Sequence, residues 1–126
     1  MYQHLSSSTP VARKVHSCCE CNCPINIGVK YSRDNYLWDG DFNTGAAHIE
    51  CQEAGGANFD FLDTGDGGRY YIADGMDNWG FLSAEVGYFL EGLRTEYPVV
   101  YARLNGDKRI ADRDAELSRL KAAREI

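Results

Sequence analysis

The spacing of cysteine and histidine residues constrains this chain more than any other feature of its sequence. Four of the five cysteines and one of the three histidines fall within "HSCCECNCP", residues 16–24. This stretch contains a Cys-x-x-Cys pair, and a His-x-x-Cys pair follows farther along. Zinc takes four thiolate and imidazole ligands in a tetrahedron, so the two pairs together predict one zinc site. The predicted ligands are Cys18, Cys21, His48 and Cys51.

The crowding of cysteines leaves a second ligand register open. Cys19 with Cys23 is a weaker alternative to the first pair, and His16 would replace one ligand in another arrangement. A Cys-x-x-Cys pair also serves as a redox dithiol, but the βαβ context of thioredoxin-like enzymes is missing from the sequence. We therefore retain the two metal-ligand registers as the interpretation.

The predicted metal is structural zinc in a reducing compartment. The first 17 residues contain no apolar stretch like that of a secretory signal, and the number of cysteines is odd. Both features predict a cytoplasmic protein, where clustered cysteines are more often ligands than disulfides. Because four good ligands are at hand, we expect a closed site with no open position for catalysis. Glu50, which lies between two predicted ligands, is expected to face solvent.

A β-hairpin and a short helix are expected between and around the two ligand pairs. The 26 residues that separate the pairs contain two apolar, aromatic stretches. They predict strands over Val29–Ser32 and Tyr36–Phe42, with a turn at Asp34-Asn35. The next segment, 46–56, predicts a short helix that ends at two glycines. A knuckle, a hairpin and a ligand-bearing helix follow one another in the order of a treble-clef zinc finger.

The predicted ligands belong to a longer pattern of residues. It consists of Cys18, Cys21, Ile25, Gly28, Tyr31, Trp38, Asp39, Gly40, Phe42, His48 and Cys51. This pattern resembles that of small zinc-binding proteins of bacteriophages and prophages, which are similar in outline to LIM-type treble clefs. The resemblance covers roughly residues 13–56 and implies a fold rather than an activity.

The second half of the chain is predicted to be a small sheet with two helices. A helix is expected after the N-cap Ser83, with Pro98 preventing its continuation, and a final amphipathic helix is expected within 106–126. The expected strands are Phe59–Leu62, Arg69–Ala73, Trp79–Leu82 and 99–104.

The predicted fold class is therefore α+β, a treble-clef lobe followed by a small antiparallel sheet with two helices. We expect a flexible segment at 1–14, the zinc lobe at 15–56 and an acidic α+β lobe at 57–126.

The charge distribution points to a basic partner rather than to nucleic acid. The net charge is −6, and residues 57–93 contain seven acidic residues against a single arginine. Nucleic-acid binding depends on cationic contacts with phosphate, so this balance argues against it. Carboxylates interleaved with aromatic residues suit a basic protein surface. The residues predicted to bind the partner are Asp60, Asp63, Asp66, Asp74 and Asp77.

These features predict a binding protein, a monomer or homodimer, rather than an enzyme. If the resemblance to phage proteins holds, the expected role is that of a host-takeover or anti-defence factor, such as an inhibitor of a CRISPR effector. One alternative is a nucleic-acid-binding finger that contacts phosphate through basic residues of the zinc lobe, namely Arg13, Lys14, Lys30 and Arg33. The other is a metal-dependent nuclease.

Overall fold

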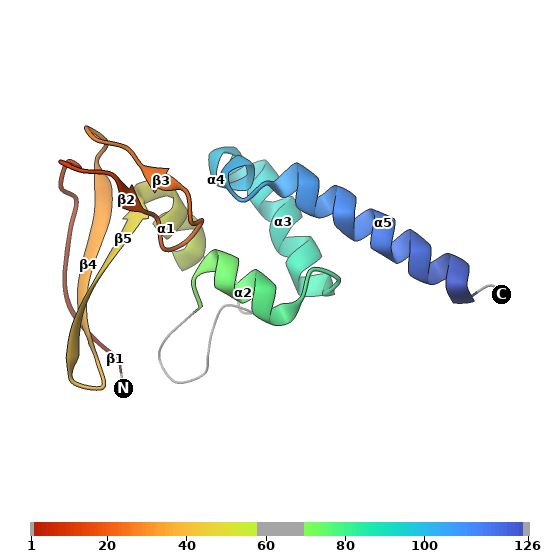
Figure 1. Ribbon diagram of the computed structural model, residues 1–126, viewed down its shortest axis with the longest axis horizontal. Coiled ribbons are helices and arrows are strands. Elements are labelled where there is room, and N and C mark those ends of the chain that lie inside the picture. The colour runs from red at the N-terminus through yellow and green to blue at the C-terminus, as the bar shows by residue number, and fades with distance from the viewer. Residues whose placement is uncertain (1, 58–69, 125–126) are drawn as a thin grey trace.

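The computed structural model describes residues 2–57 and 70–124 and shows an α+β protein with a small antiparallel sheet. The strands belong to the first part of the chain, and the helices from α2 onward form the second (Figure 1). The elements are β1 Tyr2–Ser8, β2 His16–Ser17, β3 Pro24–Ile25, β4 Tyr31–Trp38, β5 Asp41–His48, α1 Ile49–Gly56, α2 Ile72–Trp79, α3 Ala84–Glu96, α4 Pro98–Arg103 and α5 Gly106–Arg124.

The hairpin of β4 and β5 forms the centre and one edge of a sheet with the strand order β1-β4-β5. The two strands are longer than predicted, and their turn lies at Asp39-Gly40. Both turn residues have positive φ, 50° and 86°, which is the requirement of a two-residue hairpin turn and suits an Asp-Gly pair. The predicted turn at Asp34-Asn35 is wrong. These residues lie inside β4, opposite Gly45 and Thr44.

The segment 1–14 is not the flexible lead-in that its polar composition predicts. Residues 2–8 form β1, which pairs with β4 in antiparallel register. Side chains reinforce the backbone ladder: Ser7 donates to Asp34 and Asn35 donates to Ser6, at 2.6 and 3.0 Å. A polar strand can form here because its stability comes from cross-strand hydrogen bonds rather than from a buried face.

The helix α1 agrees with the predicted short helix, and α3 and α5 agree with the two predicted helices. The helix α3 buries Val86, Phe89, Leu90 and Leu93 at helical spacing. The helix α5 has a thinner stripe, in which Ile110 is half-buried, and its C-terminal end projects away from the other helices (Figure 1).

The predicted second sheet is wrong for every part of it that the structure describes. Residues 72–79 form α2, and residues 98–103 form α4 where a strand was expected. Pro98 occupies the first turn of α4, where a proline without an amide hydrogen is well tolerated. The apolar run that follows buries Val100, Tyr101 and Leu104, which is the spacing of one helical face. The predicted strand Phe59–Leu62 lies outside the described residues.

One core joins the two halves of the chain. Cys18, Ile25 and Ala54 from the first half are in the same buried cluster as Phe89 and Val100 from the second. The helices α1 and α4 also contact each other directly. Among the described residues, no helix is both long enough and apolar enough to cross a membrane.

Candidate metal centre

Two of the predicted ligands lie on a tight knuckle between β2 and β3. The two short strands pair through His16 with Ile25 and Ser17 with Pro24. The knuckle is closed by the Cys18 amide, which donates to the Cys23 carbonyl at 2.9 Å. Asn22 has a φ of 64°, a left-handed conformation that asparagine tolerates better than most residues. The turn leaves Cys18 fully buried and Cys21 nearly so.

The other two predicted ligands lie where β5 passes into α1. His48 is the last residue of β5, and Cys51 is in the first turn of the helix, three residues later and fully buried. The His48 ring is held in one orientation, because its Nε2 lies 3.2 Å from the carbonyl oxygen of Pro24. A proton on Nε2 donated to that carbonyl leaves the lone pair of Nδ1 for a metal.

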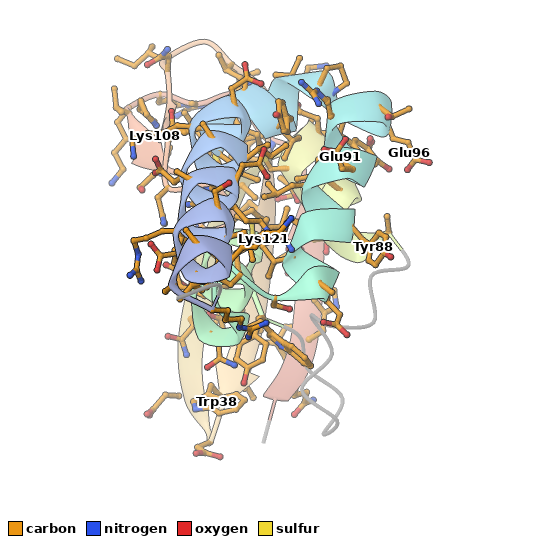
Figure 2. All side chains as sticks on the ribbon, turned by 90° about the vertical axis from the view of Figure 1, so that its right-hand side faces the viewer. Trp38, Tyr88, Glu91, Glu96, Lys108 and Lys121 are labelled. Atoms are coloured by element: carbon orange, nitrogen blue, oxygen red, sulfur yellow. The ribbon has the colours of Figure 1, made fainter. Side chains whose placement is uncertain are left out.

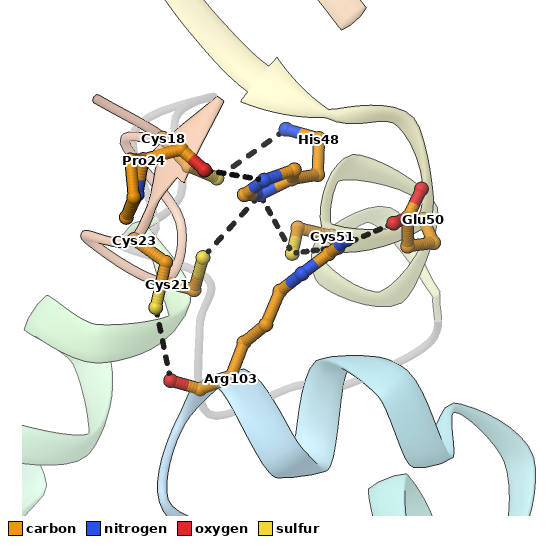
Figure 3. Close-up of polar contacts among 8 residues, drawn as sticks. All are labelled: Cys18, Cys21, Cys23, Pro24, His48, Glu50, Cys51 and Arg103. Carbon is orange, nitrogen blue, oxygen red and sulfur yellow. Dashed lines mark hydrogen bonds and ion pairs between the residues drawn. The ribbon is translucent and has the colours of Figure 1, made fainter. Parts of the chain in front are cut away.

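The four predicted ligands come together in one buried cluster (Figure 3). Their ligand atoms all lie within 4.8 Å of one another, and all four residues are buried. The His48 Nδ1 lies 3.5 Å from the Cys21 Sγ and 3.7 Å from the Cys51 Sγ. Zinc bonds of about 2.3 Å to sulfur and about 2.0 Å to nitrogen set such pairs about 3.5 Å apart in a tetrahedron. The donor set and these spacings are therefore consistent with a zinc site.

Hydrogen bonds among the three thiols of the cluster shift their pKa values in opposite directions. Hydrogen bonds from Cys21 and Cys51 lower the pKa of Cys18 far below that of an ordinary thiol. The hydrogen bond to Cys18 raises the pKa of Cys21 to about 12, and hydrogen bonds to both neighbours raise the pKa of Cys51. The backbone amide of His48 also donates to the Cys18 sulfur, at 3.3 Å. A bound dication would reverse this balance by stabilising all three thiolates.

The remaining cysteines and His16 lie outside the cluster, which favours the first of the two registers. The Cys23 Sγ donates to the backbone carbonyl of Arg103 at 3.2 Å. Cys19 is half-buried against the core, and its amide donates to the Ala46 carbonyl. The His16 ring lies against Tyr31, with 4.8 Å between ring centroids.

A cation from the helical half reaches the edge of the cluster, which the sequence did not predict. The Arg103 guanidinium forms an ion pair with Glu50 and lies 3.6 Å from the Cys51 Sγ (Figure 3). The Glu50 side chain, which was expected to face solvent, is 42% exposed, but its carboxylate is paired with Arg103 rather than free. Burial opposes ionisation of its carboxyl group, but a backbone amide and Arg103 together hold its pKa below the ordinary value.

The knuckle also contacts the start of α2. Glu20, between the two cysteines of the first pair, is 1% exposed, and its carboxylate accepts a hydrogen bond from the Ile72 amide at 2.9 Å. Its backbone carbonyl accepts from the Ala73 amide at 3.0 Å. The two bonds satisfy amides at the helix start that have no partner within the helix. The sequence offers no signal for this contact beyond an acidic residue within the knuckle.

The structure places two of the five predicted partner-binding aspartates. Asp74 and Asp77 are exposed on α2, and an Asp77 oxygen lies 3.9 Å from the Arg109 guanidinium. The other three, Asp60, Asp63 and Asp66, lie outside the described residues. Among the described residues, the predicted partner-binding set is therefore represented by the α2 pair, Asp74 and Asp77.

A serine, a histidine and an aspartate meet on the sheet surface, but not in the order of a hydrolase triad. The Ser7 hydroxyl lies 2.8 Å from the His4 Nε2 and donates to Asp34 at 2.6 Å. In a triad the carboxylate binds the histidine nitrogen that the serine does not use. Here the Asp34 carboxylate accepts hydrogen bonds from the serine hydroxyl and from the Gln52 side-chain amide, the latter at 2.8 Å. The group therefore joins β1, β4 and α1.

Comparison of the chain with protein-family models, with curated proteins and with solved structures found no match. The resemblance of residues 13–56 to small phage zinc proteins thus depends on the residue pattern alone.

Proposed function

We propose that this protein is a treble-clef zinc protein whose ion is structural and whose function is to bind another protein. The observation that carries the first part is the buried cluster Cys18, Cys21, His48 and Cys51, whose ligand atoms lie within 4.8 Å of one another. The knuckle, the β4–β5 hairpin and α1 follow in treble-clef order. Zinc bound here would join the knuckle to the helix and stabilise the folded chain directly.

Two features support a structural role for this zinc rather than a catalytic one. Catalytic sites keep a position open for water beside three protein ligands, whereas here four residues surround the site. The carboxylate of Glu50, which precedes Cys51 in the chain, is paired with Arg103 rather than free to act as a base. With three thiolates and a neutral imidazole, the zinc site carries one net negative charge, and the Arg103 guanidinium is placed to offset it.

The binding function is supported by the exposed face of α3. Tyr88 is 81% exposed, and Glu91 and Glu96 lie on the same helix (Figure 2). The helix carries three glutamates against one arginine, and Arg94 lies 3.7 Å from Glu91. Tyrosine is favoured at the centre of protein interfaces, while surrounding carboxylates speed the approach of a cationic partner. We define the acidic α3 face by Glu85, Tyr88, Glu91 and Glu96.

The partner class that we propose is a basic protein surface, such as the nucleic-acid groove of a bacterial defence complex. The resemblance of the zinc lobe to phage proteins makes an anti-defence role the first to test. Tyr88→Ala removes an exposed side chain, so it should leave folding intact while it lowers binding.

The experiment captures partners from bacterial lysate with the zinc-loaded protein, followed by mass spectrometry. A basic partner that is retained by the wild type, lost with Tyr88→Ala and retained by Lys121→Ala supports the proposal. Lys121 is exposed near the C-terminal end of α5, which projects away from the other helices (Figure 1). Equal capture by all three proteins would contradict it. Zinc content, measured by elemental analysis, tests the metal separately and should give about one ion per chain.

A further inference from the structure

The zinc lobe has a second surface, at the opposite end of the molecule from the free end of α5. The loops that precede β2 and follow β3 lie side by side there (Figure 1). The Ala12 amide donates to the Val29 carbonyl, and the Gly28 amide donates to the Ala12 carbonyl, both at 2.9 Å. Val11 and Lys30 form an isolated antiparallel bridge. These bonds fix the two loops against each other.

This surface combines cationic and aliphatic side chains. Val11 is 50% exposed, Ile27 66% and Val29 42%. Among them lie three exposed basic residues, and none of these forms an ion pair with any residue in 2–57 or 70–124. We call this surface the cationic loop patch. It consists of Val11, Arg13, Lys14, Ile27, Val29 and Lys30.

The charge of the patch is not balanced locally. Residues 9–33 contain four basic side chains and one acidic side chain, Glu20, which is 1% exposed and directed at α2. The chain as a whole carries a charge of −6, so this surface has the opposite sign to the net charge of the protein. Its field would attract an anionic partner and repel a cationic one.

We propose that the cationic loop patch binds an acidic peptide segment that carries interspersed aliphatic side chains. The basic residues would pair with the carboxylates, while Val11, Ile27 and Val29 would lose water against the aliphatic side chains. Segments that alternate acidic and hydrophobic residues are common in disordered proteins. Because the two loops are already fixed by backbone hydrogen bonds, little order has to be gained on the protein side.

The chemistry of the patch favours a peptide over nucleic acid. Proteins that bind single strands combine cations with exposed aromatic rings on which bases stack. The apolar members of this patch are all aliphatic, and the nearby Tyr31 ring is buried against His16. A membrane surface is also less suited, since interfacial binding typically uses tryptophan, phenylalanine or leucine on a helix. This proposal does not depend on the acidic α3 face.

The test uses the full-length, zinc-loaded protein and fluorescence anisotropy. The first probe is a labelled peptide of about 12 residues in which Glu and Asp alternate with Leu and Ile. The second replaces each Leu and Ile by Ser and keeps the charge, and the third is a short single-stranded DNA of equal charge. We expect the aliphatic peptide to bind at least about fivefold more tightly than the serine peptide and than the DNA.

Matched variants locate the binding. Lys30→Glu should weaken the binding of the aliphatic peptide about tenfold, and Ile27→Ser should weaken it about fivefold. Lys121→Glu makes the same charge change on exposed α5 and should stay within about twofold of wild type. Thermal melts of each variant should match that of the wild type, since all three side chains are exposed.

Three results would overturn the proposal. Tighter binding of the DNA would assign the patch to nucleic acid. Equal binding of the two peptides would show that the aliphatic side chains contribute nothing to affinity. No binding of either peptide would show that the patch is not a peptide-binding site. Equal losses for Lys30→Glu and Lys121→Glu would reduce the effect to net charge. Tyr88→Ala should leave peptide binding unchanged, so failure here is distinguishable from failure of the acidic α3 face.

Discussion

Replacing the buried Glu20 by alanine should destabilise the protein although the residue binds no metal. Its carboxylate is 1% exposed and accepts the Ile72 amide at 2.9 Å, at the first residue of α2. Loss of the acceptor leaves a buried amide unsatisfied, which costs about 1–3 kcal/mol. The favourable interaction of the carboxylate with the helix dipole, about 0.5–1 kcal/mol, is lost as well. We therefore expect the free energy of unfolding to fall by about 1.5–4 kcal/mol.

The measurement is chemical denaturation followed by circular dichroism at saturating zinc. Glu53→Ala is the control, because Glu53 is exposed on α1, and it should change the stability by less than about 0.5 kcal/mol. Zinc stoichiometry should be unchanged in both variants. A Glu20→Ala protein as stable as the control would refute the argument that the knuckle caps α2. Loss of zinc in that variant would show instead that Glu20 acts on the metal site.

Three further predictions concern the metal centre. Cys51→Ser should lose both bound zinc and the cooperative melt, whereas Cys19→Ser should keep both. Elemental analysis measures the zinc, and thermal melts with and without chelator measure the stability. An unchanged melt for Cys51→Ser would exclude Cys51 as a ligand. Arg103→Met should lower zinc affinity about tenfold in a chelator competition, because it removes the cation beside the Cys51 sulfur; an unchanged affinity would make the contact incidental. Zinc affinity should rise with pH, since the pKa values of Cys21 and Cys51 are raised without metal and binding removes both protons. Calorimetric titration with zinc in buffers of different ionisation enthalpy should report about two protons released per zinc ion near pH 7. A zinc affinity that does not change with pH would contradict this prediction.

The candidate ligands were predictable because their spacing is local. Each pair spans four residues, and a short turn or the first turn of a helix brings such residues together whatever the rest of the chain does. The spacing did not determine which cysteines of the knuckle face inward. That depends on the β2–β3 pairing and on the left-handed Asn22.

The errors in secondary structure have two separate causes. In the hairpin, both Asp34-Asn35 and Asp39-Gly40 have turn chemistry, and the pair with glycine forms the two-residue turn because both positions need positive φ. In the second half, the run 99–104 is short and apolar, a pattern that does not separate strand from helix. Pro98 and the burial of Val100, Tyr101 and Leu104 on one face decide for the helix.

The contacts that join the metal centre to the helices were beyond sequence reasoning. Glu20 meets Ile72 across 52 residues, and Arg103 meets Glu50 across 53. No local pattern encodes a pairing over such separations. In the sequence alone, Glu20 and Arg103 resemble ordinary charged surface residues.

These contacts would carry the effect of a bound zinc ion beyond the lobe that holds it. The knuckle that would hold the ion also caps α2 through Glu20, and Cys51 lies beside the Arg103 guanidinium of α4. The buried Cys18 shares one core with Phe89 and Val100 of the helical half. Removal of a bound metal would break the four bonds that join the knuckle to the end of β5 and to α1, and it would leave three thiols close together. The resulting strain would reach the Glu20 contact with α2 and the Arg103 contact from α4. Since the buried face of α3 packs on the same core, the position of the acidic α3 face should depend on an ion that it never touches.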